Sequence, residues 1–136
     1  MNILFFLTPK KDVAYISEND TLRQAMEKME HHRYASIPVL SADGTFYGVL
    51  SEGDLLFTLK NDLDLDLSAT EKVRVSEITM KNRYHCVDIS ASMKDLVSLA
   101  NDQSFVPVVD DDRHFIGIVR RKELLHYLYT HAVLDE

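Results

Sequence analysis

An internal repeat constrains this chain of 136 residues more than any other feature of its sequence. Pro38 and Pro107 stand 69 positions apart, and so do Gly48 and Gly117. Each proline lies in a short apolar run, and each glycine lies in a second apolar run that follows a polar turn. Self-similarity of this kind indicates one supersecondary unit that occurs twice. We therefore expect two copies of one structural unit.

Both copies show the same order of predicted elements: strand, helix, strand, turn, strand, helix. Strands are expected at 13–16, 37–40 and 46–50 in the first copy and at 87–89, 106–109 and 115–119 in the second.

The helix after the first strand of each copy has apolar residues at i, i+3, i+4 and i+7, which predicts one buried face. These residues are Leu22, Ala25, Met26 and Met29 in the first copy and Met93, Leu96, Val97 and Ala100 in the second.

Capping-box spacing marks the start of both helices. The pair is Thr21 with Gln24 in the first copy, where Asp20 is a rival cap, and Ser92 with Asp95 in the second.

These patterns divide the chain into a first repeat at 1–60, an acidic linker at 61–72 and a second repeat at 73–136, together one compact module. The Asp-x-Asp-x-Asp run of the linker has the spacing of a calcium loop. However, Leu67 and Val73 stand where such a loop needs glycine and glutamate, so we reject calcium binding. Val75 and Ile78 are expected to lead into the second repeat.

Composition excludes several partners. The formal net charge is -7, whereas binding to nucleic acid or to an anionic membrane needs clustered cations, so we expect neither partner. The single cysteine, Cys86, excludes an internal disulfide and a cysteine zinc site, and favours a reducing, cytoplasmic location. The apolar start, 1–7, is too short for a signal peptide or a membrane span, and it lacks a basic flank. We expect it to pack on the fold or on a partner subunit.

The end of the first repeat carries the motif Gly48-x-x-Ser51-x-x-Asp54, where a predicted strand turns into a helix. The first backbone N–H groups of a helix lack intrahelical partners and attract anions. Ser51 is suited to bond a phosphate or ribose oxygen, and Asp54 to accept from two ribose hydroxyls. In the alternative interpretation, Ser51 only caps the helix and Asp54 only complements its dipole.

The whole pattern resembles a tandem pair of CBS domains, the family named after cystathionine beta-synthase, and in particular its stand-alone bacterial members. The resemblance covers nearly the whole chain, because both proline strands and both strand-to-helix junctions occur in order. It implies a mixed α/β fold of two beta-alpha-beta-beta-alpha repeats related by a pseudo-twofold axis, called a Bateman module. Clefts of such modules bind adenosine-containing ligands.

The resemblance also implies a ligand site in the first repeat. Ser51 and Asp54 match the positions that hold ribose or phosphate, Thr8 and Val13 match positions that line the site, and Tyr34 and Ala35 match positions beside the adenine. Packing before a strand is an equally good explanation of Tyr34.

The second repeat departs from the motif, because Arg120 and Glu123 replace the hydroxyl and the aspartate. Arg120, Arg121 and Lys122 instead place three cations at an expected helix start, where the helix dipole disfavours them. A bound phosphate would relieve that cost. A solvated basic turn, paired with the acidic run 110–112 or with Glu123, is the alternative.

These observations predict a regulatory protein that senses AMP, ADP, ATP or cyclic di-AMP and signals through ligand-dependent binding of an unidentified effector protein. S-adenosylmethionine fits less well, because its sulfonium would lie near three cations. No catalytic set of residues is recognisable, and His126 and His131 are five positions apart rather than the four of a helical metal pair.

The second hypothesis is a ligand-free interaction module that forms a homodimer. The last helix carries an amphipathic face for such a contact, unless that face packs on its own core. The face consists of Leu125, Leu128, Tyr129 and Ala132, with Leu124 and Val133 beside it.

Overall fold

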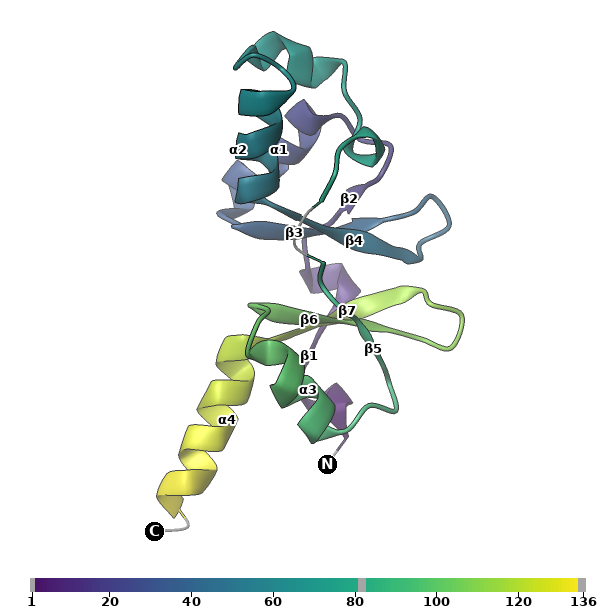
Figure 1. Cartoon of the computed structure of the whole chain (residues 1–136). Coiled ribbons are helices and arrows are strands. Elements are labelled where there is room, and N and C mark those ends of the chain that lie inside the picture. Colours follow the sequence, from purple (N-terminus) through teal and green to yellow (C-terminus); the bar gives the residue numbers. More distant parts are fainter. Residues whose placement is uncertain (1, 81–82, 135–136) are drawn as a thin grey trace. The chain divides into compact units, whose positions relative to one another are not determined.

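The structure is a computed structural model that describes residues 2–80 and 83–134, with side chains described up to His131. The chain folds into two compact units (Figure 1). One unit is Ala14–Arg83, and the other combines Met1–Val13 with Tyr84–Glu136. Within the described residues, each unit contains one sheet and two α-helices.

The unit of residues 14–83 contains the first repeat. Its elements are β2 (Ile16–Ser17), α1 (Leu22–His32), β3 (Ser36–Leu40), β4 (Phe46–Ser51) and α2 (Glu52–Asn61). The sheet has the order β2-β3-β4, in which β2 and β3 are parallel and β3 and β4 are antiparallel. A parallel pair needs a crossover connection, which α1 supplies. Both helices cover the same face of the sheet (Figure 1).

The other unit repeats this plan with one added strand. Its elements are β5 (Val87–Asp88), α3 (Met93–Ala100), β6 (Phe105–Val109), β7 (Phe115–Arg120) and α4 (Arg121–Leu134). The sheet order is β1-β7-β6-β5. The predicted α/β class and the predicted order of elements are therefore confirmed in both repeats.

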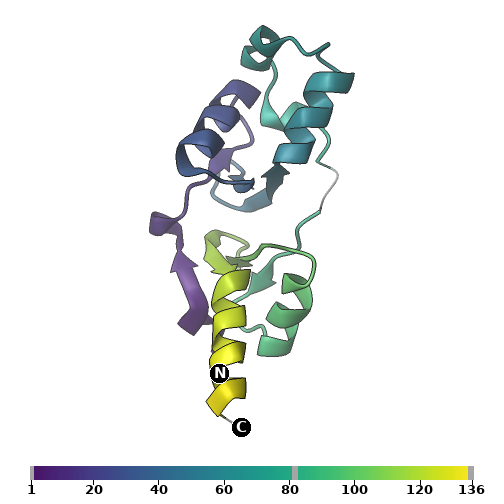
Figure 2. The ribbon, with the colours of Figure 1, turned by 90° about the vertical axis from the view of Figure 1, so that its left-hand side faces the viewer.

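The added strand comes from the start of the chain. Strand β1 (Leu7–Pro9) pairs antiparallel with β7, so that Leu7 lies opposite Val119 and Thr8 opposite Ile118. Two short 3-10 helices flank it, Ile3–Phe6 and Lys10–Asp12. In Figure 2, β1 is the purple strand at the edge of this sheet. The sequence predicted a strand at 13–16 in this region but not β1.

Capping boxes begin both crossover helices, as the spacing predicts. Thr21 Oγ1 accepts a hydrogen bond from Gln24 N at 3.1 Å, and Gln24 Oε1 accepts one from Thr21 N at 2.8 Å. Ser92 and Asp95 make the same reciprocal pair. The rival cap Asp20 instead accepts from Ser17 N at 2.9 Å. Reciprocal bonds satisfy two amides that the helix itself leaves without partners.

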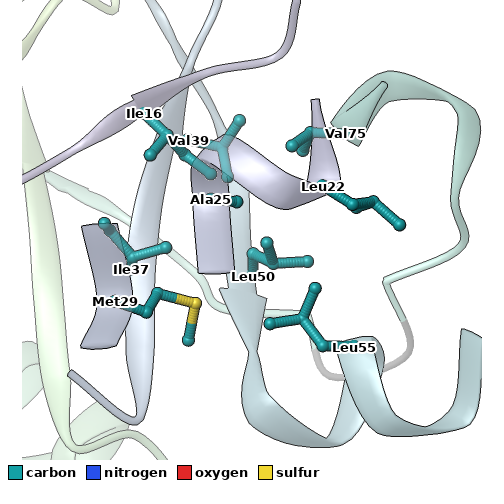
Figure 3. Packing of buried hydrophobic residues seen from close by; sticks show 9 residues of the cluster. All are labelled: Ile16, Leu22, Ala25, Met29, Ile37, Val39, Leu50, Leu55 and Val75. Atoms are coloured by element: carbon teal, nitrogen blue, oxygen red, sulfur yellow. The ribbon is translucent and has the colours of Figure 1, made fainter. Parts of the chain in front are cut away.

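The core of the first-repeat unit lies between the sheet and its two helices (Figure 3). It consists of Ile16, Leu22, Ala25, Met29, Ile37, Val39, Leu50, Leu55 and Val75. Val75, which is fully buried, lies in a 3-10 helix at Val75–Glu77, beyond the acidic stretch. The amide of Leu22 also donates to the carbonyl of Val73 at 2.8 Å. The segment that follows the acidic stretch thus packs with the first repeat.

The core of the other unit includes the apolar start of the chain. Ile3 is 1% exposed and Phe6 is 8% exposed, and both belong to the buried cluster that contains Leu96, Val119 and Leu124. The expectation that the start of the chain packs on the fold is therefore confirmed for these two residues. The boundaries predicted from the repeat lie after residues 60 and 72. The compact units of the structure instead divide the chain after residues 13 and 83.

No helix in the described part of the chain has both the length and the apolar character needed to cross a membrane.

Candidate ligand-binding site

The motif of the first repeat lies where β4 ends and α2 begins. Ser51 is the last residue of β4 and the N-cap of α2, with extended backbone angles. Its Oγ accepts a hydrogen bond from Asp54 N at 3.1 Å, and Ser51 N donates to Asp54 Oδ2 at 3.0 Å. Asp54 is only 5% exposed. The capping role offered as an alternative is therefore present in the structure.

Capping does not use the full bonding capacity of the Ser51 hydroxyl. A serine hydroxyl has one donor and two acceptor sites. The capping box occupies one acceptor site on Ser51. A ligand can thus be bound by a hydroxyl that also holds the helix start in place.

Fewer backbone amides at this helix start are available to a ligand than the sequence suggests. Glu52 N donates to the carbonyl of Ala35 at 3.0 Å, and Asp54 N donates to Ser51. Two of the first three amides of α2 therefore already have protein partners. Any ligand contact at this junction depends mainly on the Ser51 and Asp54 side chains.

Tyr34 and Ala35 lie beside this junction. Ala35 is exposed and is held to Glu52 by the backbone bond, while the next residue, Ser36, lies opposite Ser51 in the β3–β4 ladder. The structure thus brings together four of the predicted site residues.

The side chain of Tyr34 has a structural partner. It is half-buried and packs against the core, and its hydroxyl accepts a hydrogen bond from Ala14 N at 3.3 Å. The packing role is therefore present, and contact with a base stays a prediction.

The remaining predicted residues, Thr8, Val13, Arg120, Arg121 and Lys122, belong to the other compact unit. Thr8 lies in β1, and Val13 is buried at 6% exposure. No single unit holds all nine predicted residues.

The three cations of the second repeat have different surroundings. Arg120 ends β7, so α4 begins one residue later than the sequence suggests. Arg121 Nε donates to the carbonyl of Ala100 at 2.7 Å and to that of Gln103 at 3.1 Å, at the end of α3. Carbonyls at a helix end lack intrahelical partners and attract cations, so Arg121 has a structural role. Arg120 is half-exposed and Lys122 is exposed.

Sequence reasoning missed the role of Gln103. This side chain is 3% exposed and bonds both main-chain groups of His85, at 2.8 Å to the amide and 3.0 Å to the carbonyl. Gln103 stands 69 positions after Tyr34, which bonds Ala14. In both repeats this position tethers the segment that enters the first strand. The spacing of 69 positions pairs Tyr34 with Gln103, but two such different side chains give no sequence signal of a shared role.

A curated relative, the homoserine O-acetyltransferase of Methanocorpusculum labreanum, is 27% identical over 109 residues. The match covers 80% of this chain and 21% of that enzyme, so the chain spans about a fifth of the length of this relative.

Solved structures resemble the chain over almost its full length. A hypothetical conserved protein from Geobacillus kaustophilus has a TM-score of 0.86 and 26% identity, covering 96% of this chain and 98% of its own. The CbpB protein of Listeria monocytogenes, solved with cyclic di-AMP, has a TM-score of 0.85 and 24% identity over 97% and 98% of the two chains. CBSX2, solved with AMP, has a TM-score of 0.75 and 25% identity over 96% and 98%.

A family model described as the CBS domain matches residues 6–61 and matches again at residues 75–130. Each match contains one full set of the strand, helix, strand, strand and helix elements. The two matches agree with the repeat seen in the sequence and with the two sheets of the structure. This chain therefore belongs to the CBS domain family and carries two CBS domains in tandem.

Proposed function

We propose that this protein is a regulatory sensor of adenine nucleotides that acts in the cytoplasm and has no enzymatic activity of its own. It binds AMP, ADP, ATP or cyclic di-AMP and signals by binding an effector protein differently in the ligand-bound and ligand-free states. Such an output requires the nucleotide to have different affinities for the two states.

The junction of β4 and α2 is the observation that carries this proposal. The motif of the first repeat is complete there, and Ser51, Asp54 and Ala35 lie together with defined geometry. CbpB from Listeria monocytogenes, with cyclic di-AMP, and CBSX2, with AMP, support a nucleotide ligand, because both have the same fold.

The proposed roles follow the chemistry of each side chain. Ser51 and Asp54 bind ribose hydroxyls or a phosphate, and Tyr34 and Ala35 lie against the adenine. In the other compact unit, Thr8 and Val13 are the residues that match ligand-lining positions. Arg120 and Lys122 attract phosphate. Arg121 adds charge but is held by the carbonyls at the end of α3. S-adenosylmethionine ranks below the phosphate-bearing ligands because its sulfonium would be repelled by these cations.

Thermal unfolding of the purified chain, stripped of bound ligand, tests the proposal. AMP, ADP, ATP, cyclic di-AMP and S-adenosylmethionine are titrated separately. A ligand at about a hundred times its Kd adds roughly 2.7 kcal/mol, which raises Tm by roughly 10 °C in a chain of this size. A saturable shift with at least one phosphate-bearing ligand supports the proposal, and no shift with any of them contradicts it.

A matched pair of variants separates ligand contact from helix capping. Asp54→Asn and Asp95→Asn remove the same charge from equivalent capping boxes, in α2 and in α3. Asp54→Asn should weaken nucleotide binding about tenfold or more, because a hydrogen bond to a charged group contributes roughly 1.5–3 kcal/mol. Asp95→Asn should leave the Kd unchanged. Equal effects of the two variants on Kd would show that Asp54 acts only through the fold.

The role of the cations has its own test, in which Arg121 is kept because it bonds the backbone. The double variant Arg120→Gln, Lys122→Gln should weaken AMP binding much more than adenosine binding, since only AMP carries a phosphate. Calorimetric titration of both ligands measures the difference. Equal weakening of the two ligands would remove phosphate contact from the proposal.

Self-association is a second candidate function, favoured by one observation on α4. Leu125 is 57% exposed, Leu128 42% and Tyr129 71%, whereas Leu124 is buried in the core. The side chains of Ala132 and Val133, which the sequence places on or beside this face, lie outside those described. Exposed apolar residues on one helix favour a homodimer. Light scattering should give a dimer mass for the native chain and a monomer mass for Leu125→Glu. Leu65→Glu, which changes an exposed leucine outside α4, is the control and should remain a dimer. A monomer mass for the native chain would contradict this function.

A further inference from the structure

A pocket of about 400 Å³ lies between the start of the chain and α4, within one compact unit. Small-molecule sites usually have volumes of roughly 300–1,000 Å³, so this pocket has room for a small ligand. Its lining includes Phe5, Phe6, Thr8, Glu123, Tyr127 and His131. The nucleotide proposal does not use this pocket, apart from the contact assigned to Thr8.

The polar lining of the pocket favours a ligand that donates hydrogen bonds. Glu123 supplies a carboxylate, which only accepts when ionised. His131 Nδ1 lies 2.9 Å from the carbonyl oxygen of Tyr127, and a carbonyl oxygen can only accept, so Nδ1 carries the proton. In a neutral imidazole the other nitrogen, Nε2, is then an acceptor. Among the described residues that line the pocket, none is lysine or arginine.

The apolar lining of the pocket is aromatic. The rings of Phe6 and Tyr127 meet edge to face with centroids 5.0 Å apart, and the Tyr127 and His131 rings lie 3.9 Å apart. Phe5 also lines the pocket although it is 73% exposed. Aromatic faces attract cations and also pack against flat apolar groups.

We propose that this pocket binds a small organic cation, an ammonium or amidinium group on a flat apolar body. The positive group pairs with Glu123, and the apolar body packs against Phe5 and Tyr127. A phosphate is disfavoured here, because the described lining residues include a carboxylate and neither lysine nor arginine. The site is therefore chemically distinct from the phosphate-binding residues proposed above, and its test does not depend on nucleotide binding.

The test is an NMR titration of the full isotope-labelled chain with benzamidine at pH 8, where imidazole groups are ordinarily neutral. Benzyl alcohol and benzoate are the neutral and anionic probes of similar size. The proposal predicts saturable shifts of the amides of residues 5–8 and 123–131 with benzamidine, and much weaker shifts with the other two probes. Equal shifts with all three probes, or no saturable shift with benzamidine, would overturn the proposal.

Three variants test which side chains contact benzamidine. Glu123→Gln keeps the shape of the side chain and removes its charge, and should raise the Kd of benzamidine roughly two- to fivefold, since Glu123 is exposed. Phe5→Leu removes an exposed ring without opening the core, and should raise the Kd roughly two- to fivefold. Glu30→Gln, an exposed carboxylate on α1, is the matched control and should have no effect. An unchanged Kd for Glu123→Gln would refute the assigned charge pairing.

Discussion

Gly117 is the position at which one added methyl group should damage the fold most. A Cβ built there would lie 2.2 Å from the carbonyl oxygen of Thr8 and 2.9 Å from a methyl carbon of Leu7. Backbone atoms cannot avoid such a contact by changing rotamer. Strand β1, which has only three residues, would have to move away from β7. The change Gly117→Ala therefore tests whether β1 lies where the structure places it.

The expected cost follows from what β1 would lose. Overpacking commonly costs about 1–3 kcal/mol, and each lost backbone hydrogen bond adds roughly 1 kcal/mol. We therefore expect Gly117→Ala to lower the free energy of unfolding by about 3 kcal/mol and Tm by roughly 10 °C. Gly48 occupies the same position in the first repeat, but a Cβ there would meet the flexible end of Met80 at 3.0 Å. Gly48→Ala should cost less than about 1 kcal/mol, since this side chain can move.

Circular dichroism of both variants, in thermal and urea unfolding, measures the difference. The result expected is a large loss of stability for Gly117→Ala and a small one for Gly48→Ala. Equal losses for the two glycines, or an unaffected Gly117→Ala, would refute the packing of β1 against β7.

Three further experiments test other parts of the structure. Ile3→Ala should lower the free energy of unfolding by roughly 2–5 kcal/mol, because the Ile3 side chain is 1% exposed. Leu4→Ala should lower it much less, because Leu4 is 43% exposed. Equal losses for the two variants in urea unfolding would contradict the packing of the chain start. Tyr34→Phe removes the acceptor for Ala14 N and should cost about 1 kcal/mol in the same assay; no loss would show that the bond is not formed in solution. Hydrogen bonds from Ser68 lower the pKa of Asp66 in the folded protein. The stabilisation that they provide is therefore present above the pKa of Asp66 in the unfolded chain, and it is lost as the pH falls through the lower pKa of Asp66 in the folded protein. Ser68→Ala should raise that pKa in an NMR titration, and an unchanged pKa would contradict the assigned cause.

Local patterns in the sequence predicted the repeated unit well. The spacing of 69 positions, the apolar faces of α1 and α3, and the capping pairs that begin them all depend on residues near one another in the chain. Hydrogen bonds between positions three apart require no knowledge of the rest of the fold. These features were therefore accessible from sequence alone.

The sequence did not predict which distant segments pack against each other. Strand β1 pairs with β7 about a hundred residues later, and Val75 packs into the core of the first repeat rather than the second. The local sequence around Leu7–Pro9 and Val75 does not specify which sheet or core they join. Packing of both segments depends on the whole chain.

In the candidate site, too, the sequence predicted local contacts but not long-range ones. The motif predicted that Ser51 and Asp54 act together, and the structure places them in one reciprocal pair. The motif did not reveal that Arg121 is held by two carbonyls at the end of α3, because those partners precede it by about 20 positions. Charge in the sequence indicated where cations lie, but not which of them are available to a ligand.

Amide shift mapping of the labelled chain with AMP and cyclic di-AMP tests whether the β4–α2 junction binds a nucleotide. We expect at least one of the two ligands to shift the amides of residues 34–36 and 51–54 saturably, because these residues form the β4–α2 junction and its neighbouring segment. Saturable binding that leaves those amides unshifted, or no binding of either nucleotide, would contradict the claim that this junction is the nucleotide site.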